Sequence, residues 1–327
     1  IITSHLGRPT EGVYEESLSL KPICKYLSAL LERDIKFFNS YRDNINFEDY
    51  EIAMLENVRF NTGEKSSNSD LSKAYASLAD YFVFDAFGVA HRKESSTFGV
   101  SEYLKTYPGL NISNEIHTIN QLINEDSRPM TIIISGAKVS TKLIVIQKLL
   151  AKCDFMILGG GILNTFLKAK GNEIGNSLYE EDLVNEAKNI LSSDFSSKII
   201  FPIDLSCESE SKPKNIDVSN ISKNDIIFDV GEKSLEHIKS IINKSAAIFW
   251  NGPLGYVEKE PFDRGTIELA KIIAEHNCFS IIGGGDTLPI IENLNLQSQF
   301  SCLSTGGGSL LTYLEGGDLP ILDKLDL

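Results

Sequence analysis

The sequence contains no run of apolar residues near the ~18 that a membrane-spanning helix requires. Its five cysteines are widely spaced and never form a Cys-x-x-Cys pair, and none of its five histidines stands at zinc-ligand spacing from another histidine or cysteine. We therefore expect a protein of the reducing cytoplasm, with no membrane partner and no zinc site. The cysteines are Cys24, Cys153, Cys207, Cys278 and Cys302.

The chain also has no excess of basic residues. The 327 residues carry 31 Lys and Arg against 45 Asp and Glu, and the net charge of -14 is spread over both halves of the chain. Nucleic acid is therefore not expected as a partner. An anionic small molecule can bind only where a few arginines converge locally. A chain of this length predicts about two domains.

Short apolar runs alternate with helical patterns, which predicts an α/β fold with parallel sheets covered by helices. Helices are expected at residues 69–79 and 178–191, and the polar stretch 206–220 is expected to be an exposed loop. The expected strands are 52–55, 81–84, 130–134, 155–158, 198–203, 246–249 and 279–282.

The sequence Tyr-Pro-Gly at residues 107–109 interrupts this pattern, and isoleucines then recur at helical spacing from Ile112 to Ile123. We expect a connecting helix over residues 110–126. The predicted domains are then 1–109 and 127–310, and a last segment, 311–327, is expected to return to the first domain.

Three Gly-Gly-Gly triplets, at residues 159–161, 283–285 and 306–308, follow apolar runs directly or within a few residues. Glycine lets the backbone approach a charged oxygen closely, and the N-terminus of a following helix attracts anions. The triplets therefore indicate phosphate-binding loops. The alternative is that they serve only tight turns or close packing of strand and helix.

Two more loops follow predicted strands, Gly-Ala-Lys-Val-Ser-Thr-Lys at residues 136–142 and Trp-Asn-Gly-Pro-Leu-Gly at residues 250–255. Ligands of open α/β sheets lie at this edge of the sheet. Lys138 and Lys142 are four residues apart, so both would lie on one face if the segment opened a helix, close to phosphate oxygens. Otherwise they are two solvated lysines.

Asp286 and Thr287 follow the second triplet. A carboxylate beside a phosphate loop suggests Mg²⁺ held between Asp286 and phosphate oxygens; the alternative is that Asp286 caps the next helix. The chain has no Walker A loop, and the triplet at 159–161 lacks the last glycine of the dinucleotide fingerprint.

In the first half, one arginine follows each of three strand-like runs: Arg8, Arg59 and Arg92. Guanidinium groups bind phosphate or carboxylate with two hydrogen bonds, so these loops predict an oxyanion site, although each arginine alone could be a surface residue. We interpret the neighbouring His5 and His91 as binding residues rather than acid-base catalysts.

Taken together, these motifs resemble the phosphoglycerate kinase family. The matching segments run in order along nearly the whole chain: 4–9, 55–60, 85–92, 136–143, 250–255, 283–287 and 304–308. The resemblance implies two Rossmann-like α/β domains joined by a hinge helix. It also implies reversible phosphoryl transfer between 1,3-bisphosphoglycerate and ADP, giving 3-phosphoglycerate and ATP in glycolysis and gluconeogenesis, by a monomer that uses Mg²⁺ with the nucleotide.

The resemblance also assigns roles to single residues. The 3-phosphoglycerate-binding residues would be His5, Arg8, Arg59 and Arg92, and the catalytic residues Lys142, Gly306, Gly307 and Gly308. The nucleotide-binding residues would be Lys138, Lys142, Gly159, Gly160, Asn251, Glu258, Gly284, Gly285, Asp286 and Thr287, with Asp286 as the metal ligand.

The sequence also departs from the family pattern. Family members begin before the Ser-His-Leu-Gly-Arg motif at residues 4–8, Ser135 stands where glycine is usual, and residues 92–95 read Arg-Lys-Glu-Ser. The chain is therefore expected to be a fragment that binds Mg-nucleotide but has an incomplete acid site and little turnover. The alternatives are a nucleotide-binding protein of this fold without turnover and a two-domain solute-binding protein.

Overall fold

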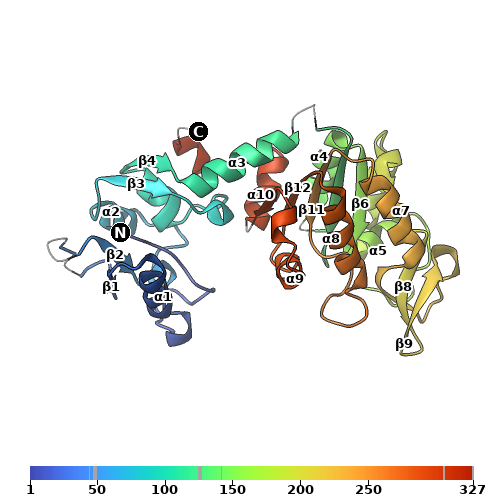
Figure 1. Ribbon diagram of the computed structural model, residues 1–327, viewed down its shortest axis with the longest axis horizontal. Helices are drawn as coiled ribbons and strands as arrows, with labels where there is room; N and C mark the ends of the chain where they lie inside the picture. Colours follow the sequence, from blue (N-terminus) through green and yellow to red (C-terminus); the bar gives the residue numbers. More distant parts are fainter. Residues whose placement is uncertain (44, 47–49, 124–126, 141, 305, 326–327) are drawn as a thin grey trace. The chain divides into compact units, whose positions relative to one another are not determined.

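The computed structural model describes residues 1–43, 45–46, 50–123, 127–140, 142–304 and 306–325. The chain divides into two compact units, one formed by residues 1–113 and 318–327 and the other by residues 114–317. Helix α3 (Leu110–Ile123) begins in the first unit and continues into the second (Figure 1). No helix in the described ranges is long and apolar enough to cross a membrane.

The described strands of the first unit form two parallel pairs. Strand β1 (Ile35–Phe38) pairs with β2 (Ile52–Leu55), and β3 (Tyr81–Phe84) pairs with β4 (Lys105–Pro108). Its helices are α1 (Lys21–Leu31) and α2 (Ser69–Ala76), with short helical turns at Glu16–Leu18, Val58–Phe60, Phe87–Val89, Ser95–Gly99 and Leu322–Lys324.

Helix α2 shows how the local sequence sets an element. The Asn68 side chain accepts hydrogen bonds from the backbone N–H groups of Asp70 and Leu71, which is the usual way for asparagine to begin a helix. Leu71 and Tyr75 then pack into a core that includes Leu55. The helix ends at Ala76, before the expected residue 79, because the N–H groups of Leu78 and Ala79 bond three residues back in tight turns.

The last described residues belong to the first unit. Residues 318–325 follow Gly317, the end of the second unit, and the Lys324 ammonium lies 5.5 Å from the centre of the Phe98 ring. Ile321 is fully buried there, so the segment is held by apolar packing as well as by a cation–π contact.

The second unit is built on a six-stranded parallel sheet, which confirms the predicted fold class. The strand order is β13-β12-β11-β5-β6-β7. Strands β5 and β11 are buried along their whole length, as expected for central strands covered on both faces. The bounds are β5 Met130–Ser135, β6 Phe155–Gly159, β7 Ile199–Ile200, β11 Ala247–Asn251, β12 Phe279–Gly283 and β13 Cys302–Ser304.

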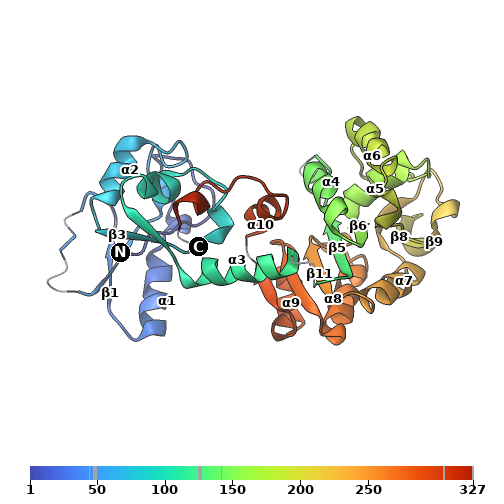
Figure 2. The same cartoon turned by 90° about the horizontal axis from the view of Figure 1, so that it is seen from above.

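Helices cover both faces of this sheet (Figure 2), with α4 and α5 on one side and α8 and α9 on the other. The fully buried Trp250 lies in a core that includes Ile133 and Ile282 of neighbouring strands and Leu269 of α8. The helices are α4 Leu143–Lys152, α5 Gly160–Ala169, α6 Val184–Leu191, α7 Glu232–Ile242, α8 Arg264–His276, α9 Leu288–Asn293 and α10 Gly307–Leu314, with short turns at Glu181–Leu183, Ser196–Lys198, Val218–Asn220 and Gln297–Gln299.

The expectation of an exposed loop at 206–220 is wrong. Strands β8 (Asp204–Ser209) and β9 (Lys212–Asp217) form an antiparallel hairpin, and β10 (Ile226–Val230) pairs with the other edge of β8. The turn residues Glu210 and Ser211 have φ of 50° and 61°, the left-handed pair of a two-residue hairpin. Such turns usually have the sequence Asn-Gly, which is not present here, and strand β9 is solvated. Neither segment therefore shows a sequence pattern that predicts a strand.

Two expected elements are shorter than predicted. The strand expected at 198–203 is limited to β7, since Pro202 has no N–H to extend the ladder. The helix expected from residue 178 begins at Val184, because the Glu180 N–H bonds to the Thr165 side chain instead of entering a helix.

Candidate active site

The carboxyl ends of the strands of the second unit lie at one edge of the sheet. Asn251, the last residue of β11, is in register with Ile134 of β5 on one side and Gly283 of β12 on the other. Gly283 is in turn level with Ser304 of β13. Because parallel strands all end at this edge, the loops that follow them form one surface.

Lys142 is fixed at this edge. Its Nζ donates hydrogen bonds to the backbone oxygen of Ser135 at 2.5 Å and to Oδ1 of Asn251 at 2.6 Å. Burial lowers the pKa of Lys142 to about 8, and the charge of Asp286 partly opposes this shift. The side chain is therefore a positioned cation at pH 7, linking the ends of β5 and β11.

The structure does not place Lys138 on a helix with Lys142. Lys142 precedes α4 as its N-cap, and Lys138 is exposed in the loop before it. Thr141 of this motif lies outside the described residues. The loop before α4 is instead held against α5, because the Gly136 backbone oxygen accepts a hydrogen bond from the Ile162 N–H group.

Positions within the glycine triplets differ in how strictly they require glycine. Gly160 has φ +59°, and a Cβ there would lie 2.8 Å from the Gly136 oxygen, so close backbone packing alone requires glycine. An added Cβ at Gly285, by contrast, would meet nothing within 4 Å. The packing alternative therefore explains Gly160, whereas Gly285 has open space beside it. Gly159 is the N-cap of α5, and Gly284 adopts φ +120°.

Asp286 is exposed, and Thr287, not Asp286, is the N-cap of α9. The capping alternative for Asp286 is therefore wrong. Thr287 is fully buried, with no hydrogen-bond partner for its Oγ1 among the described residues. The described ranges contain no cluster of three or more His, Cys, Asp or Glu side chains able to hold a metal. A single exposed carboxylate fits a Mg²⁺ ion whose other ligands are phosphate oxygens and water.

The third triplet begins helix α10, with Gly306 as N-cap and Gly307 as first residue. Gly306 N–H donates to Ser304 Oγ at 3.1 Å, and that hydroxyl donates to Glu115 at 2.8 Å. Thr305 lies outside the described residues. Gly308 is exposed, so the free N–H groups at the start of α10 can face an anion.

A cavity of ≈ 640 Å³ lies beside these loops within the second unit. Three predicted residues line it, namely Gly160, Glu258 and Asp286. Sequence reasoning missed its apolar wall, in which the Phe228 and Tyr256 rings stack with centroids 5.5 Å apart. The remaining lining residues are Gly136, Ala137, Gly161, Asn164, Asn176, Leu178, Ile226, Ile227, Pro253 and Gly255.

In the first unit, Asn57 connects the predicted loops. Its side-chain amide donates to the backbone oxygens of Leu6 at 2.8 Å and Leu18 at 3.0 Å. Arg59 Nη1 donates to the Gly7 oxygen at 2.9 Å. The loops at 4–9 and 56–60 are thus held together by buried polar side chains. Asn57 is a residue that the sequence analysis did not single out.

Two of the three predicted arginines meet at one carboxylate. Glu94 Oε1 lies 3.3 Å from both Arg59 Nη2 and Arg92 Nη1. Arg59 is 4% exposed and its Nε has no partner among the described residues. Arg8 is exposed, and the ion pairs of Glu94 in the described part of the chain do not include it. Glu94 was not predicted, although it stands only two residues after Arg92.

The two histidines flank this cluster. The pKa of His5 is lowered by burial first and by the charge of Arg59 second. Arg92 Nε donates to Nε2 of His91 at 3.3 Å, and burial lowers the pKa of His91 as well. Both imidazoles are thus biased toward the neutral form, which suits hydrogen bonding more than charge pairing.

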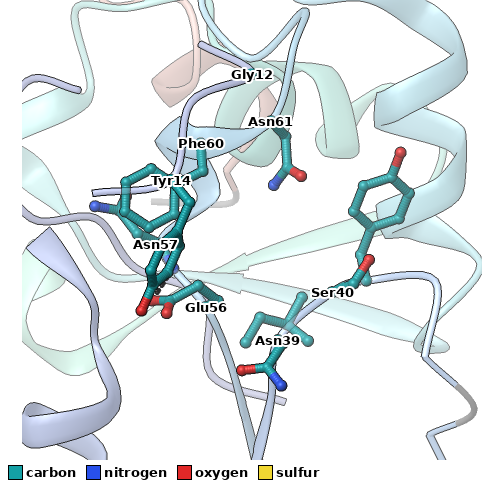
Figure 3. Close-up of a pocket in the computed structure, with 10 residues that line it drawn as sticks. Gly12, Tyr14, Asn39, Ser40, Glu56, Asn57, Phe60 and Asn61 are labelled. Carbon is teal, nitrogen blue, oxygen red and sulfur yellow. Dashed lines mark hydrogen bonds between the residues drawn. The ribbon is translucent and has the colours of Figure 1, made fainter. Parts of the chain in front are cut away.

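A smaller pocket of ≈ 210 Å³ opens next to the loop that follows β2 (Figure 3). Tyr14, Asn39, Asn57 and Asn61 are among its polar lining side chains. Its charged group, Glu56, is buried and accepts hydrogen bonds from Ser19, Leu20 and Asn57. This pocket contains none of the predicted 3-phosphoglycerate-binding residues, and its lining is less suited to an anion than the arginine cluster.

Comparison with known proteins gives consistent results. A family model described as phosphoglycerate kinase matches residues 1–317. The phosphoglycerate kinase of Francisella philomiragia is 42% identical over 332 residues, covering 99% of this chain and 85% of the relative. That of Baumannia cicadellinicola is 42% identical over 328 residues, covering 99% and 84%.

Two solved structures share the fold. The structure of phosphoglycerate kinase from Coxiella burnetii superposes with a TM-score of 0.88 at 37% identity, covering 98% of this chain and 84% of that one. Phosphoglycerate kinase from Pyrococcus horikoshii gives a TM-score of 0.85 at 27% identity, covering 98% and 85%.

Proposed function

The chain belongs to the phosphoglycerate kinase family, and we propose that its second unit binds Mg-ADP or Mg-ATP while its first unit binds 3-phosphoglycerate or 1,3-bisphosphoglycerate. The family activity is a phosphotransferase step of glycolysis. The phosphorus–oxygen bond of the acyl phosphate breaks and a bond to the terminal oxygen of ADP forms, or the reverse. We place this reaction in the cytoplasm, in keeping with the free thiols of all five cysteines.

The chemistry requires stabilisation of charge more than proton transfer. In the ATP-consuming direction the acceptor is a carboxylate, whose usual pKa of about 3.5 to 4 leaves it deprotonated at pH 7. No general base is needed. Phosphoryl transfer depends chiefly on positioning and on donors aimed at the equatorial oxygens of the migrating group.

The observation that carries the proposal is the fixed position of Lys142. Two short hydrogen bonds hold its ammonium between Ser135 and Asn251, at the edge where β5 and β11 end. A lysine with a pKa of about 8 is charged at pH 7, and phosphate oxygens beside it would favour the charged form further. Lys142 would therefore stabilise negative charge on the migrating phosphoryl group.

The nucleotide would lie along the ≈ 640 Å³ cavity, with Glu258 near its ribose and the backbone N–H groups of Gly284 and Gly285 near its phosphates. Asp286 would hold Mg²⁺ together with phosphate oxygens, and a bound Mg²⁺ neutralises phosphate charge. The N–H groups of Gly307 and Gly308 at the start of α10 would supply further donors, whereas the N–H group of Gly306 already bonds to Ser304.

The acid would be bound by the first unit. Arg59 and Arg92 present guanidinium donors in one cluster with His5 nearby, and Arg8 offers an exposed one from the adjoining loop. Guanidinium groups stay charged at all working pH values and match the geometry of carboxylate and phosphate.

The test is the coupled assay of ATP consumption with 3-phosphoglycerate, run beside calorimetric titration with Mg-ADP. Turnover that requires both substrates is the expected result. Binding of Mg-ADP without turnover would instead support the nucleotide-binding alternative, and failure to bind either ligand would contradict the proposal as a whole.

A further inference from the structure

Asn164 is a polar side chain in an apolar part of the cavity of the second unit. It lies on α5, four residues after Gly160, so both residues share the face of the helix that lines the cavity. Only 3% of Asn164 is exposed. Its neighbours in the lining include Leu178, Ile226 and Phe228, none of which offers a polar side-chain atom.

The orientation of the Asn164 amide is set by one hydrogen bond. Nδ2 donates to the backbone oxygen of Leu178 at 3.0 Å. The opposite orientation would bring two acceptor oxygens together, so Nδ2 must face Leu178. Oδ1 therefore points elsewhere, and it is buried without a hydrogen-bond partner among the described residues. A buried acceptor without a donor is costly, which suggests that a ligand supplies one.

The surroundings indicate what kind of group that ligand carries. The stacked Phe228 and Tyr256 rings, with Leu178 and Ile227, form an apolar wall suited to a flat ring. The charged part of the lining is Asp286 and Glu258. A flat heterocycle could pack against this apolar wall and direct an N–H donor at Oδ1 of Asn164. It would then fit both the apolar wall and the unpaired acceptor.

We propose that Asn164 is a specificity-determining residue that recognises the nucleobase, with Oδ1 accepting a hydrogen bond from the exocyclic amino group of adenine. This inference rests on the proposed nucleotide site. An adenine ring carries a donor at its 6-position, whereas the same ring without the amino group leaves Oδ1 unpaired. A site built around a hydrogen-bonding group rejects an analogue that lacks the partner.

The experiment compares ADP with purine riboside 5′-diphosphate, which has hydrogen in place of the amino group, by calorimetry on the full chain. We expect the wild-type protein to bind ADP roughly tenfold more tightly, the usual scale for one unpaired buried acceptor. Asn164→Leu, which keeps the branching and the number of side-chain heavy atoms but removes the acceptor, should bind the two nucleotides equally.

Asn176→Leu is the matched control, because Asn176 lines the same cavity with an exposed side chain. It should keep the wild-type preference. Equal binding of the two nucleotides by the wild-type protein overturns the proposal without any variant, as does a preference that survives in Asn164→Leu. If Asn164→Leu does not fold, Asn164→Ala gives the same comparison. A wild-type protein that binds neither nucleotide contradicts the proposed function instead.

Discussion

Arg59 and Glu94 form an ion pair that is almost completely buried, with 5% and 8% of their side chains exposed and Nη2 3.3 Å from Oε1. The same carboxylate oxygen lies 3.3 Å from Arg92. Glu94 thus occupies the position between two guanidinium groups that an anionic ligand would also seek. The carboxylate keeps the arginines together, but it competes for their hydrogen bonds.

Replacing Glu94 by Gln should therefore tighten the binding of 3-phosphoglycerate. The amide keeps the shape of the side chain and removes the competing charge, and we expect roughly a threefold to tenfold gain in affinity, equivalent to ~1 kcal/mol. Calorimetry with the acid alone measures it, with Mg-ADP as the control ligand. Weaker binding of the acid would mean that Glu94 acts mainly by orienting the arginines.

Arg59→Ala should weaken the binding of 3-phosphoglycerate by about 1.5 to 3 kcal/mol, the scale of hydrogen bonds to a charged group, and leave nucleotide affinity unchanged. Each ligand is titrated alone, and unchanged Mg-ADP binding also reports that the variant is folded. A nucleotide constant that moves as far as the acid constant would contradict the assignment of the two ligands to different units.

Asp286→Asn should weaken Mg-ADP binding and leave metal-free ADP nearly unaffected. The amide has similar size but lacks the charge that a hard cation requires. Titration of ADP with and without Mg²⁺ separates the two effects. Equal loss in both conditions would remove Asp286 as a metal ligand.

Glu64 should make stability depend on pH. It is fully buried, and burial raises its pKa to about 7, with hydrogen bonds from Ser96 opposing the shift. Between about pH 4.5 and 7 the unfolded chain has lost this proton and the folded chain keeps it, so the free energy of unfolding falls as pH rises.

Glu64→Gln should remove that part of the slope, which amounts to at most ~3 kcal/mol across the window. Urea denaturation of both proteins at pH 4.5 and 7 measures it. The comparison is needed because burial also raises the pKa of Asp229 to about 7, and Asp229 contributes to the slope in both proteins. Parallel pH profiles would show that Glu64 is ionised in the folded state.

Several strands and the loops that follow them could be predicted from the sequence, because the residue patterns that indicate them are local. The runs at 52–55 and 81–84 form strands with the expected bounds, since short apolar runs ended by polar residues favour strands. The hairpin at 204–217 could not be predicted, because its turn is Glu-Ser and its outer strand is solvated.

The other features that could not be predicted from the sequence depend on contacts between residues far apart in the chain. The pairing of Glu94 with Arg59 joins positions 35 residues apart, and the sequence around Glu94 reads as an exposed charged stretch. Asn164 stands in the largely apolar helix α5, and only the position of the Leu178 oxygen gives its amide a direction. The roles of Lys142 and Asp286 were predicted from their places next to glycine loops, and they stay predictions.

The most direct test of the proposed mechanism is the steady-state kinetics of Lys142→Met. If the Lys142 ammonium stabilises charge chiefly on the migrating phosphoryl group, kcat should fall by two or more orders of magnitude, roughly the loss of 3 kcal/mol from the transition state. The KM values for both substrates should change much less. A variant with unchanged kcat and a raised KM for nucleotide would contradict this account, because Lys142 would then act only in binding the ground state.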